Sequence, residues 1–365
     1  MVSEKKITNF QLLFILIHSQ IGIGIITMPN EVFMKAQVDG WISVLLAGII
    51  IQIIILIFGF LMARFPSQQL YNIMQSLLGK WLGKLFILLY TIYFICLAGI
   101  FFSKFAVIIK SWMMPLTPKW ILIFLIMSLA IYAAIERLQI IARFFIISFI
   151  VIVIFLIAST YTLKDANLTY VLPVANSGLT PILKGIPTTL YSFQGFEYLL
   201  LIFPIVNSNR KGIIKTATIA NLFVTLFYTY TVLLSLLFFS PNELKLIPEP
   251  NLYLFKSLNF EIIERPDLIF TSLWIVIVVT TLIMIFYVSS LGLTVLINAS
   301  QRKISVFIVA GISFFLAMTI IGEYQISSVA KIFNPFIFLF AIGLPILFIL
   351  IAITFKKKEQ KDNNE

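Results

Sequence analysis

The stretch HSQIGIGIITMPN, residues 18–30, lies inside the first apolar run of the chain and decides how that run can fold. Gly22 and Gly24 follow His18, the only histidine of the sequence, and Pro29 lies just beyond them. Glycine weakens a helix interior, and proline kinks or breaks it. We therefore predict that the first helix is interrupted at this point.

The composition places this interruption in a lipid bilayer. Hydrophobic residues make up 61% of the 365 residues and charged residues 11%, which is more apolar surface than a soluble core can hide from water. A β-barrel would show short segments of strict apolar and polar alternation, whereas these runs are apolar on every side and too long for strands. The sequence predicts an all-α integral membrane protein.

Ten stretches have the length of a membrane-spanning helix, which needs ~20 apolar residues. They cover about 7–30, 40–63, 85–103, 120–135, 144–163, 185–209, 216–242, 268–301, 304–322 and 332–355, and Glu197 interrupts the sixth. We expect one transmembrane domain over 1–365, composed of ten transmembrane helices. The first five-helix repeat is expected over 1–160, the second over 184–355, and a basic tail over 356–365.

The basic residues predict the orientation. Ten crossings put both ends of the chain on one side, and that side carries 16 of the 26 lysines and arginines. The excess indicates cytoplasmic termini, with the long loop 241–267 outside. A cleavable signal peptide over MVSEKKITNFQLLFILIHSQ is an alternative interpretation of the basic start, although no small-x-small cleavage site follows it.

The net charge of +11 does not indicate a nucleic-acid partner. Much of it lies in short loops and in the tail FKKKEQKDNNE, where lysines and arginines are expected to meet anionic membrane lipid. Cys96 is the single cysteine, which excludes an intramolecular disulfide and a cysteine metal cluster. We expect no metal and no cofactor.

A second interruption occurs five helices further along the chain. An offset of about 174 residues carries Gly22 and Gly24 into PTTLYSFQGFEYLL, residues 187–200, where Gly195 lies between Gln194 and Glu197. Paired interruptions at matching depth in two halves are the sequence sign of a transporter fold with inverted repeats. Because five is an odd number, the second half enters the membrane in the opposite sense. We predict a five-plus-five inverted repeat with broken helices 1 and 6, as in leucine-transporter-like folds.

Broken helix ends predict the chemistry of a site near the middle of the bilayer. The N-terminus of a half-helix suits a carboxylate, and unwound carbonyls suit an ammonium or a cation. An α-amino acid carries both groups and is the first expectation for the ligand. The candidate ligand-binding residues are Gly22, Ile23 and Gly24 in helix 1, Tyr93 and Leu97 in helix 3, Gln194, Gly195 and Glu197 in helix 6, and Thr281 and Tyr287 in helix 8.

Each candidate also has a purely structural interpretation. The glycines can allow close helix packing, and the residues of helices 3 and 8 can serve interhelical packing. Glu197 either contributes to the function, as acidic residues inside spans usually do, or is a neutral carboxyl hydrogen-bonded to unwound backbone. His18 can relay protons or bridge two helices as a neutral side chain.

Four segments resemble a known family: TNFQLLFILIHSQIGIGIITMPN (8–30), DGWISVLLAG (39–48), LGKWLGKLFILLYTIYF (78–94) and SFQGFEYLLLIFP (192–204). They are similar to the spore germination permease family, the B subunit of the nutrient germinant receptors of endospore-forming bacteria, within the amino acid–polyamine–organocation superfamily. The most specific feature is G-x-G-I-x-T-x-P in helix 1 paired with G-x-E in helix 6. By this match Gly22, Gly24, Gln194, Gly195 and Glu197 fall in the family's binding region. Gln194 departs from the more apolar residue expected before that glycine.

The resemblance implies a sensor of a small nutrient, often an amino acid, in the inner membrane of the spore. It implies two partners, a larger A subunit and a lipoprotein C subunit. A proton- or sodium-coupled amino acid transporter would use the same fold, so it stays the alternative. An enzyme is disfavoured because the sequence holds no metal-ligand spacing, no phosphate loop and no soluble domain for a site.

Overall fold

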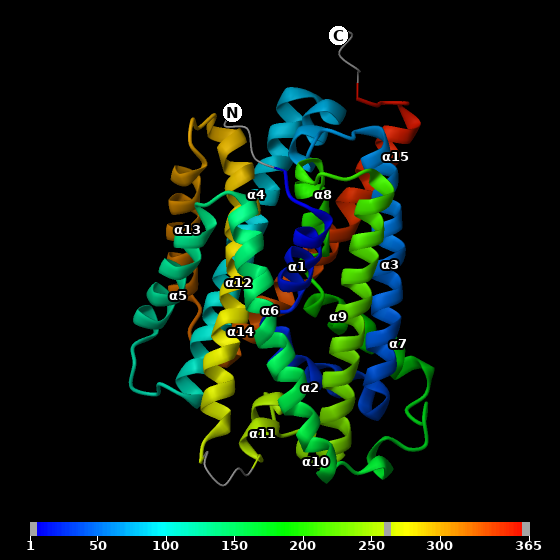
Figure 1. The fold of residues 1–365 in the computed structure, drawn as a ribbon, viewed down its shortest axis with the longest axis vertical. Coiled ribbons are helices and arrows are strands. Elements are labelled where there is room, and N and C mark those ends of the chain that lie inside the picture. Colours follow the sequence, from blue (N-terminus) through cyan, green and yellow to red (C-terminus); the bar gives the residue numbers. More distant parts are fainter. Residues whose placement is uncertain (1–5, 259–263, 360–365) are drawn as a thin grey trace.

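The computed structural model describes residues 6–258 and 264–359, and almost every element in them is helical (Figure 1). The helices are α1 (Asn9–Gln20), α2 (Gly24–Ala36), α3 (Gly40–Arg64), α4 (Leu70–Trp112), α5 (Lys119–Ala134), α6 (Leu138–Thr160), α7 (Leu179–Ser192), α8 (Leu199–Ile202), α9 (Arg210–Phe238), α10 (Pro241–Leu244), α11 (Pro250–Lys256), α12 (Pro266–Ile297), α13 (Arg302–Thr319), α14 (Gly322–Phe338) and α15 (Leu344–Thr354). Short 3-10 turns cover Gln37–Asp39, Tyr161–Asp165, Leu168–Val171, Phe196–Tyr198 and Phe203–Ile205, and a π-helical turn, Leu339–Gly343, joins α14 to α15. The prediction of an all-α protein is confirmed.

Seven helical stretches in the described part of the chain are long and apolar enough to cross a membrane. They are Gly24–Arg64, Leu70–Trp112, Leu138–Asp165, Arg210–Phe238, Pro266–Ile297, Arg302–Thr319 and Gly322–Thr354, and Lys119–Ala134 and Phe196–Ile205 are shorter apolar helices. The chain is therefore a multi-span membrane protein. The predicted number of ten helices stays a prediction, because the broken segments such as α1, with 12 residues, are each shorter than a bilayer-spanning helix.

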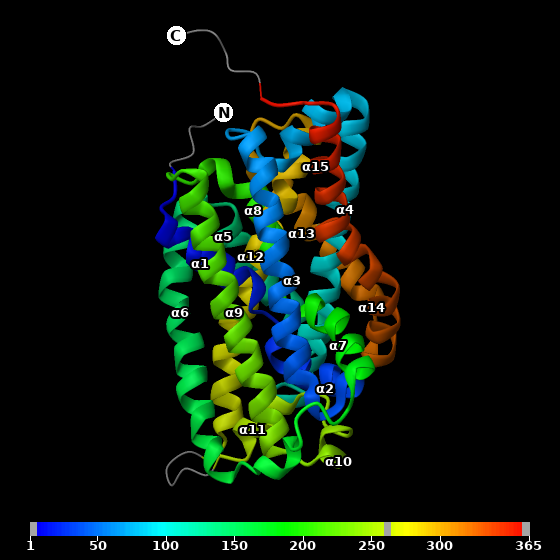
Figure 2. The ribbon, with the colours of Figure 1, turned by 90° about the vertical axis from the view of Figure 1, so that its right-hand side faces the viewer.

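The first predicted interruption is observed. α1 begins behind Thr8, whose side chain accepts a hydrogen bond from the N–H of Gln11 while Gln11 accepts one from the N–H of Thr8, a capping box that fixes the start of the helix. The helix ends at Gln20, and α2 starts again at Gly24. The two half-helices meet inside the bundle, with α1 toward the end that holds the two termini and α2 toward the opposite end (Figures 1 and 2).

The long helices surround these half-helices. α12 packs against α4, α3 packs against α9, α1 packs against α9 and α6, and α2 packs against α7. Residues 6 and 359 lie at the same end of the molecule, and α10 and α11 lie at the other end (Figure 1). The side of the membrane on which the termini and the loop 241–267 lie stays a prediction, and residues 1–5, 259–263 and 360–365 are outside the described residues.

The outer surface is apolar along the spans. On α3, the side chains of Ile49, Ile53, Leu56 and Phe60 are each at least half exposed, and their spacing places them on one face of the helix. An exposed apolar stripe of this length would aggregate in water. It is the surface expected where a helix meets lipid.

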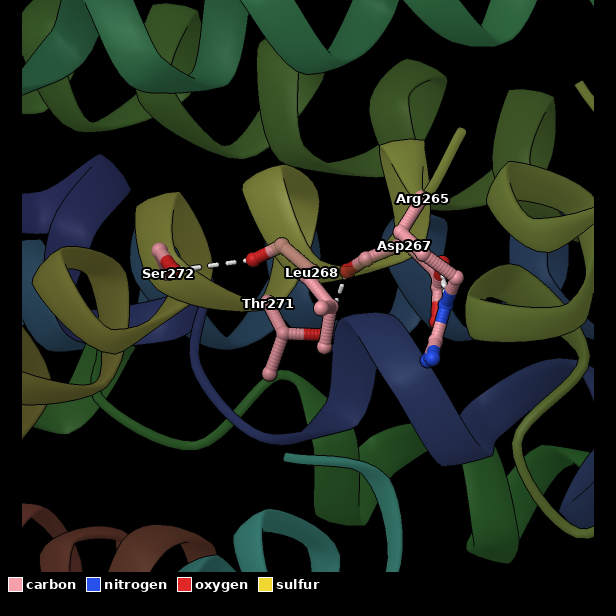
Figure 3. Close-up of polar contacts among 5 residues, drawn as sticks. All are labelled: Arg265, Asp267, Leu268, Thr271 and Ser272. Atoms are coloured by element: carbon pink, nitrogen blue, oxygen red, sulfur yellow. Dashed lines mark hydrogen bonds and ion pairs between the residues drawn. The ribbon is translucent and has the colours of Figure 1, made fainter. Parts of the chain in front are cut away.

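The start of α12 shows how polar groups are held at a helix end (Figure 3). The Asp267 side chain is 1% exposed and accepts two hydrogen bonds from the Arg265 guanidinium, at 3.0 and 2.7 Å. The Thr271 hydroxyl donates to the Asp267 carbonyl and the Ser272 hydroxyl donates to the Leu268 carbonyl. A carboxylate in the first turn also complements the positive end of the helix dipole, so this short segment fixes where α12 begins.

Several predicted span ends are wrong because the helices extend beyond them. The prediction ended the first segment at residue 30 and the third at 103, whereas α2 continues to Ala36 and α4 runs from Leu70 to Trp112. The predicted ends lie at charged residues, whereas the helices continue through Glu31 and Lys104. In the structure these two side chains form an ion pair with an N···O distance of 3.5 Å, so their charges do not end the helices.

Candidate functional site

The break between α1 and α2 is stabilised by two side chains of α12. The Thr281 hydroxyl on α12 lies 3.1 Å from the carbonyl of His18 and 3.3 Å from that of Ile21. The Trp274 indole N–H, also on α12, points at the carbonyl of Gly22 at 3.4 Å. An unsatisfied carbonyl inside a bilayer costs several kcal/mol, and these contacts supply partners for the carbonyls that the break frees.

Two glycines allow α1 and α2 to approach these neighbours. A Cβ on Gly22 would lie 2.8 Å from the Thr281 hydroxyl oxygen, and a Cβ on Gly24 would lie 2.9 Å from the Cβ of Ser192 on α7. Both distances are shorter than real Cβ contacts. The glycines therefore permit close packing, and Gly24 also lets α2 begin directly beside the end of α7.

The second break lies between α7 and the 3-10 turn at Phe196. Gly195 has φ +112° and ψ −16°, and a Cβ at this position would lie 2.4 Å from the Ser19 carbonyl oxygen. The Gly195 N–H donates to the Glu197 carboxylate at 2.8 Å. Glu197 therefore holds the backbone of the break from inside, while Gly195 lets that backbone contact the end of α1.

Tyr228 on α9 connects the two breaks. Its hydroxyl lies 2.7 Å from the carbonyl of Gln20 at the end of α1 and 3.2 Å from the carbonyl of Ser192 at the end of α7. The hydroxyl has one proton to donate, and both carbonyls point toward it. Tyr228 is fully buried, so the position of α9 sets the distance between the two broken ends.

A cavity of about 80 Å³ lies between the two breaks, which exceeds the ~10–15 Å³ that one water molecule needs. The breaks contribute Gly22, Gly24 and Gln194, and α4 and α14 complete the wall. The full lining is Ser19, Gln20, Gly22, Ile23, Gly24, Thr27, Glu31, Leu97, Ile100, Phe101, Lys104, Tyr191, Ser192, Gln194, Thr281, Ala330, Phe333, Asn334 and Ile337.

The cavity continues into a wide basin of about 940 Å³ that lies toward α10 and α11, away from the termini. The residues that line both spaces are Thr27, Glu31, Lys104, Tyr191, Ala330 and Asn334. The ion pair between Glu31 and Lys104 therefore stands where the cavity meets the basin. Both side chains are about one third exposed, so the pair contributes little stability and can open at low cost.

Six of the ten predicted site residues line the cavity: Gly22, Ile23, Gly24, Leu97, Gln194 and Thr281. The other four, Gly195, Glu197, Tyr93 and Tyr287, lie outside its lining. Tyr93 stacks on Phe333 and Phe340 at centroid distances of 5.5 and 4.7 Å, beside the cavity wall. Tyr287 lies under the guanidinium of Arg302, 4.4 Å from the ring centroid. Binding by any of the ten residues stays a prediction.

Two buried amide oxygens at the cavity have no hydrogen-bond partner in the described part of the chain. They are Oε1 of Gln20 and Oε1 of Gln194. The nitrogen of each amide is already used, donating to the carbonyl of Leu16 at 3.0 Å and of Tyr191 at 2.8 Å. Buried polar atoms without partners are uncommon in proteins, and two acceptors around one cavity suit a ligand that donates hydrogen bonds.

Sequence reasoning missed several residues of this site. Gln20 is not among the predicted binding residues, although it lies two residues before Gly22, beside the predicted break. The predicted spans end just before Glu31 and Lys104, although a charged side chain within a bilayer helix usually faces a cavity. Tyr228 and Asn334 carry no local signal, since their roles depend on how α9 and α14 pack.

His18 takes a position that agrees with a structural role. Its ring is fully buried, 5.2 Å from the ring centroid of Phe145 on α6, and Nδ1 lies 3.1 Å from the Thr280 hydroxyl on α12. The side chain thus connects α1 with α6 and α12 behind the break and does not line the cavity.

Sequence comparisons identify relatives of this chain. A family model described as "Spore germination protein" matches residues 6–326. Spore germination protein YndE of Bacillus subtilis (strain 168) is 30% identical over 293 residues, covering 79% of this chain and 80% of YndE. Spore germination protein GerQB of Bacillus cereus is 27% identical over 316 residues, covering 86% of this chain and 87% of GerQB.

A structural comparison supports the same fold class. Mhp1, a nucleobase-cation-symport-1 family transporter solved in a closed conformation with bromovinylhydantoin bound, aligns with a TM-score of 0.70 over 97% of this chain and 80% of its own. The sequence identity is 14%, so the likeness concerns the fold alone. The chain has the helical architecture of a membrane transporter.

Proposed function

Since the chain belongs to the spore germination protein family, we propose that it is the B subunit of a spore germinant receptor. It binds a small nutrient, an α-amino acid, in the cavity between the two helix breaks. Binding changes the relative populations of two conformations, which partner subunits detect. The observation that carries the proposal is a cavity bounded by both breaks, with two acceptor oxygens that have no partner among the described residues.

The cavity offers complementary groups to both ends of an amino acid. α2 begins at Gly24, and the first N–H groups of a helix have no intrahelical acceptor and form its positive end, which suits a carboxylate. The free oxygens of Gln20 and Gln194 suit an ammonium group, which only donates hydrogen bonds. The volume of about 80 Å³ favours a small side chain on the ligand.

Direct binding to the purified chain tests this proposal. A screen of radiolabelled amino acids should find at least one that binds, and Leu97→Trp should abolish that binding because the indole fills the cavity. Leu88→Trp is the matched control on the same helix, since Leu88 is 42% exposed toward the lipid. Unchanged binding by a folded Leu97→Trp protein would place the ligand elsewhere.

We further propose the full arrangement of spans. The first repeat comprises α1 with α2, then α3, α4, α5 and α6, and the inverted second repeat comprises α7 with α8, then α9, α12, α13 and α14 with α15. The termini are cytoplasmic. In a Cys96→Ala background, Leu246→Cys between α10 and α11 should react with an impermeant thiol reagent from outside, and Lys358→Cys should not. Labelling of both from outside would contradict this topology.

The partners and location follow from family membership. We propose that the subunit lies in the inner membrane of the spore and assembles with an A subunit and a lipoprotein C subunit. A tagged copy purified from dormant spore membranes should carry both with it. Recovery of the chain without either subunit would contradict the assembly.

A proton- or sodium-coupled amino acid transporter is the second candidate, favoured by the likeness in fold to Mhp1. Reconstituted vesicles separate the two functions. With a receptor subunit, the amount of ligand retained by the vesicles should not exceed the amount of protein in them. A coupled transporter should accumulate ligand inside the vesicle when an ion gradient is imposed.

A further inference from the structure

A polar basin lies at the end of the molecule that holds the termini, apart from the cavity at the helix breaks. Its volume is about 730 Å³, and it lies between the first part of α4 and the end of α12. The lining is Gln68, Asn72, Gln75, Ser76, Lys80, Lys84, Val295 and Asn298. No carboxylate is among these residues, so the basin offers hydrogen-bond donors and positive charge.

The two lysines follow a sharp turn in α4. Gly79 has φ +80° and ψ 175°, so the helix stops there and starts again at Lys80. Lys80 and Lys84 are four residues apart and therefore lie on the same face. Within the described residues neither forms an ion pair, so their charges are free to meet an anion.

An exposed apolar row begins beside the lysines and runs along α4 into the span. Trp81 is 86% exposed, and Leu82, Leu85, Leu88, Leu89 and Ile92 are each between 39% and 54% exposed. Their spacing keeps them on one side of the helix. A tryptophan at the start of such a row is typical of the membrane interface, where its indole lies at the level of the lipid headgroups.

We propose that this basin binds the headgroup of an anionic phospholipid, with the acyl chains lying along the exposed row of α4. The lysines and carboxamides contact the phosphate, and Trp81 lies at the boundary between headgroup and chain. A soluble anion or an acidic peptide would use the basin but would leave the adjoining row uncovered. The row continues directly from the basin into the bilayer, which favours a lipid as the ligand.

Native mass spectrometry of the purified full chain tests the proposal. With dioleoylphosphatidylglycerol as probe, wild type should retain bound lipid in preference to dioleoylphosphatidylcholine. The double variant Lys80→Gln, Lys84→Gln should bind phosphatidylglycerol about 30-fold more weakly, which corresponds to ~1 kcal/mol for each lysine. Lys80→Arg with Lys84→Arg keeps the charge and should keep the binding.

Lys211→Gln with Lys215→Gln is the matched control, because these lysines are also four residues apart and lie at the start of α9 at the same end of the molecule. This pair should bind phosphatidylglycerol as wild type does. The proposal would be overturned if the Lys80/Lys84 and Lys211/Lys215 glutamine variants lost phosphatidylglycerol affinity equally. It would also be overturned if wild type bound phosphatidylglycerol and phosphatidylcholine equally. Binding of a poly-glutamate peptide in place of phosphatidylglycerol would also overturn it and would assign the basin to an acidic protein segment.

A second readout reports the position of the acyl chains. Phosphatidylglycerol with brominated chains should quench the tryptophan fluorescence of the wild-type protein, and Trp81→Phe should remove most of that quenching. Quenching that is unchanged by Trp81→Phe would show that the bound lipid lies away from α4 and would contradict the proposed site.

Discussion

Replacement of Gly195 by alanine should destabilise the protein strongly, since this residue allows the two helix breaks to touch. The backbone at Gly195 has φ +112°, and an added Cβ would lie 2.4 Å from the Ser19 carbonyl oxygen and 2.6 Å from its carbon. Both atoms belong to the backbone of α1, which is fixed by the contacts of Thr281 and Tyr228. The clash therefore cannot be relieved by rotation of a side chain.

The cost has two contributions. Left-handed backbone costs a residue with a side chain roughly 1–2 kcal/mol, and overpacking of a filled interior typically costs about 1–3 kcal/mol. Together they lower the free energy of unfolding by about 2–5 kcal/mol, which is a large part of the 5–15 kcal/mol that holds a typical protein folded. At ~2 °C per kcal/mol, the melting temperature should fall by roughly 4–10 °C.

The assay uses the single cysteine of the chain. Cys96 is partly buried, so a dye that becomes fluorescent on reaction with thiols reports unfolding of the purified protein during heating. Gly311→Ala on α13 is the control, because a Cβ there would meet nothing within 4 Å and alanine favours a helix. Equal melting temperatures for Gly195→Ala and Gly311→Ala would refute the packing described here.

Three further perturbations follow from the same contacts. Tyr228→Phe should lower the unfolding free energy by ~1–3 kcal/mol because the buried carbonyls of Gln20 and Ser192 lose the one donor that they share, whereas Tyr132→Phe at a 78% exposed position should change nothing in the same melting assay. Glu197→Gln keeps an acceptor for the Gly195 N–H and should have a melting temperature close to that of wild type, whereas Glu197→Ala should have a lower one. Equal decreases in melting temperature for the two variants would show that the charge matters more than the hydrogen bond. Burial raises the pKa of the Glu249 carboxyl above 4.5, so the folded state binds more protons than the unfolded state and stability falls as pH rises above this value. Glu249→Gln should therefore gain stability relative to wild type as the pH rises above 4.5, and parallel profiles of stability against pH for the two proteins would contradict this.

The helix breaks could be predicted from the sequence because their cause is local. Glycine and proline weaken a helix wherever they stand, and the second occurrence around Gly195 revealed the pairing of the two breaks. The order of apolar segments likewise followed from composition. These features need no knowledge of how the helices pack.

The contacts that hold the breaks could not be predicted in this way. Tyr228 lies in an apolar run with nothing to distinguish it, and its role depends on the 2.7 Å contact to Gln20 that only the position of α9 creates. The helices continue through Glu31 and Lys104, whose charges meet in an ion pair between residues 73 positions apart. Rules that end a span at a charged residue miss such pairs, because the charges are compensated by tertiary structure.

A structure of the chain bound to the amino acid with the highest affinity in the binding screen would show whether the cavity between the two breaks is the binding site. We expect one ligand between the two breaks, with its carboxylate at the first N–H groups of α2 and its ammonium at the oxygens of Gln20 and Gln194. A ligand bound outside this cavity, or in it with its carboxylate and ammonium exchanged, would contradict the proposed binding mode.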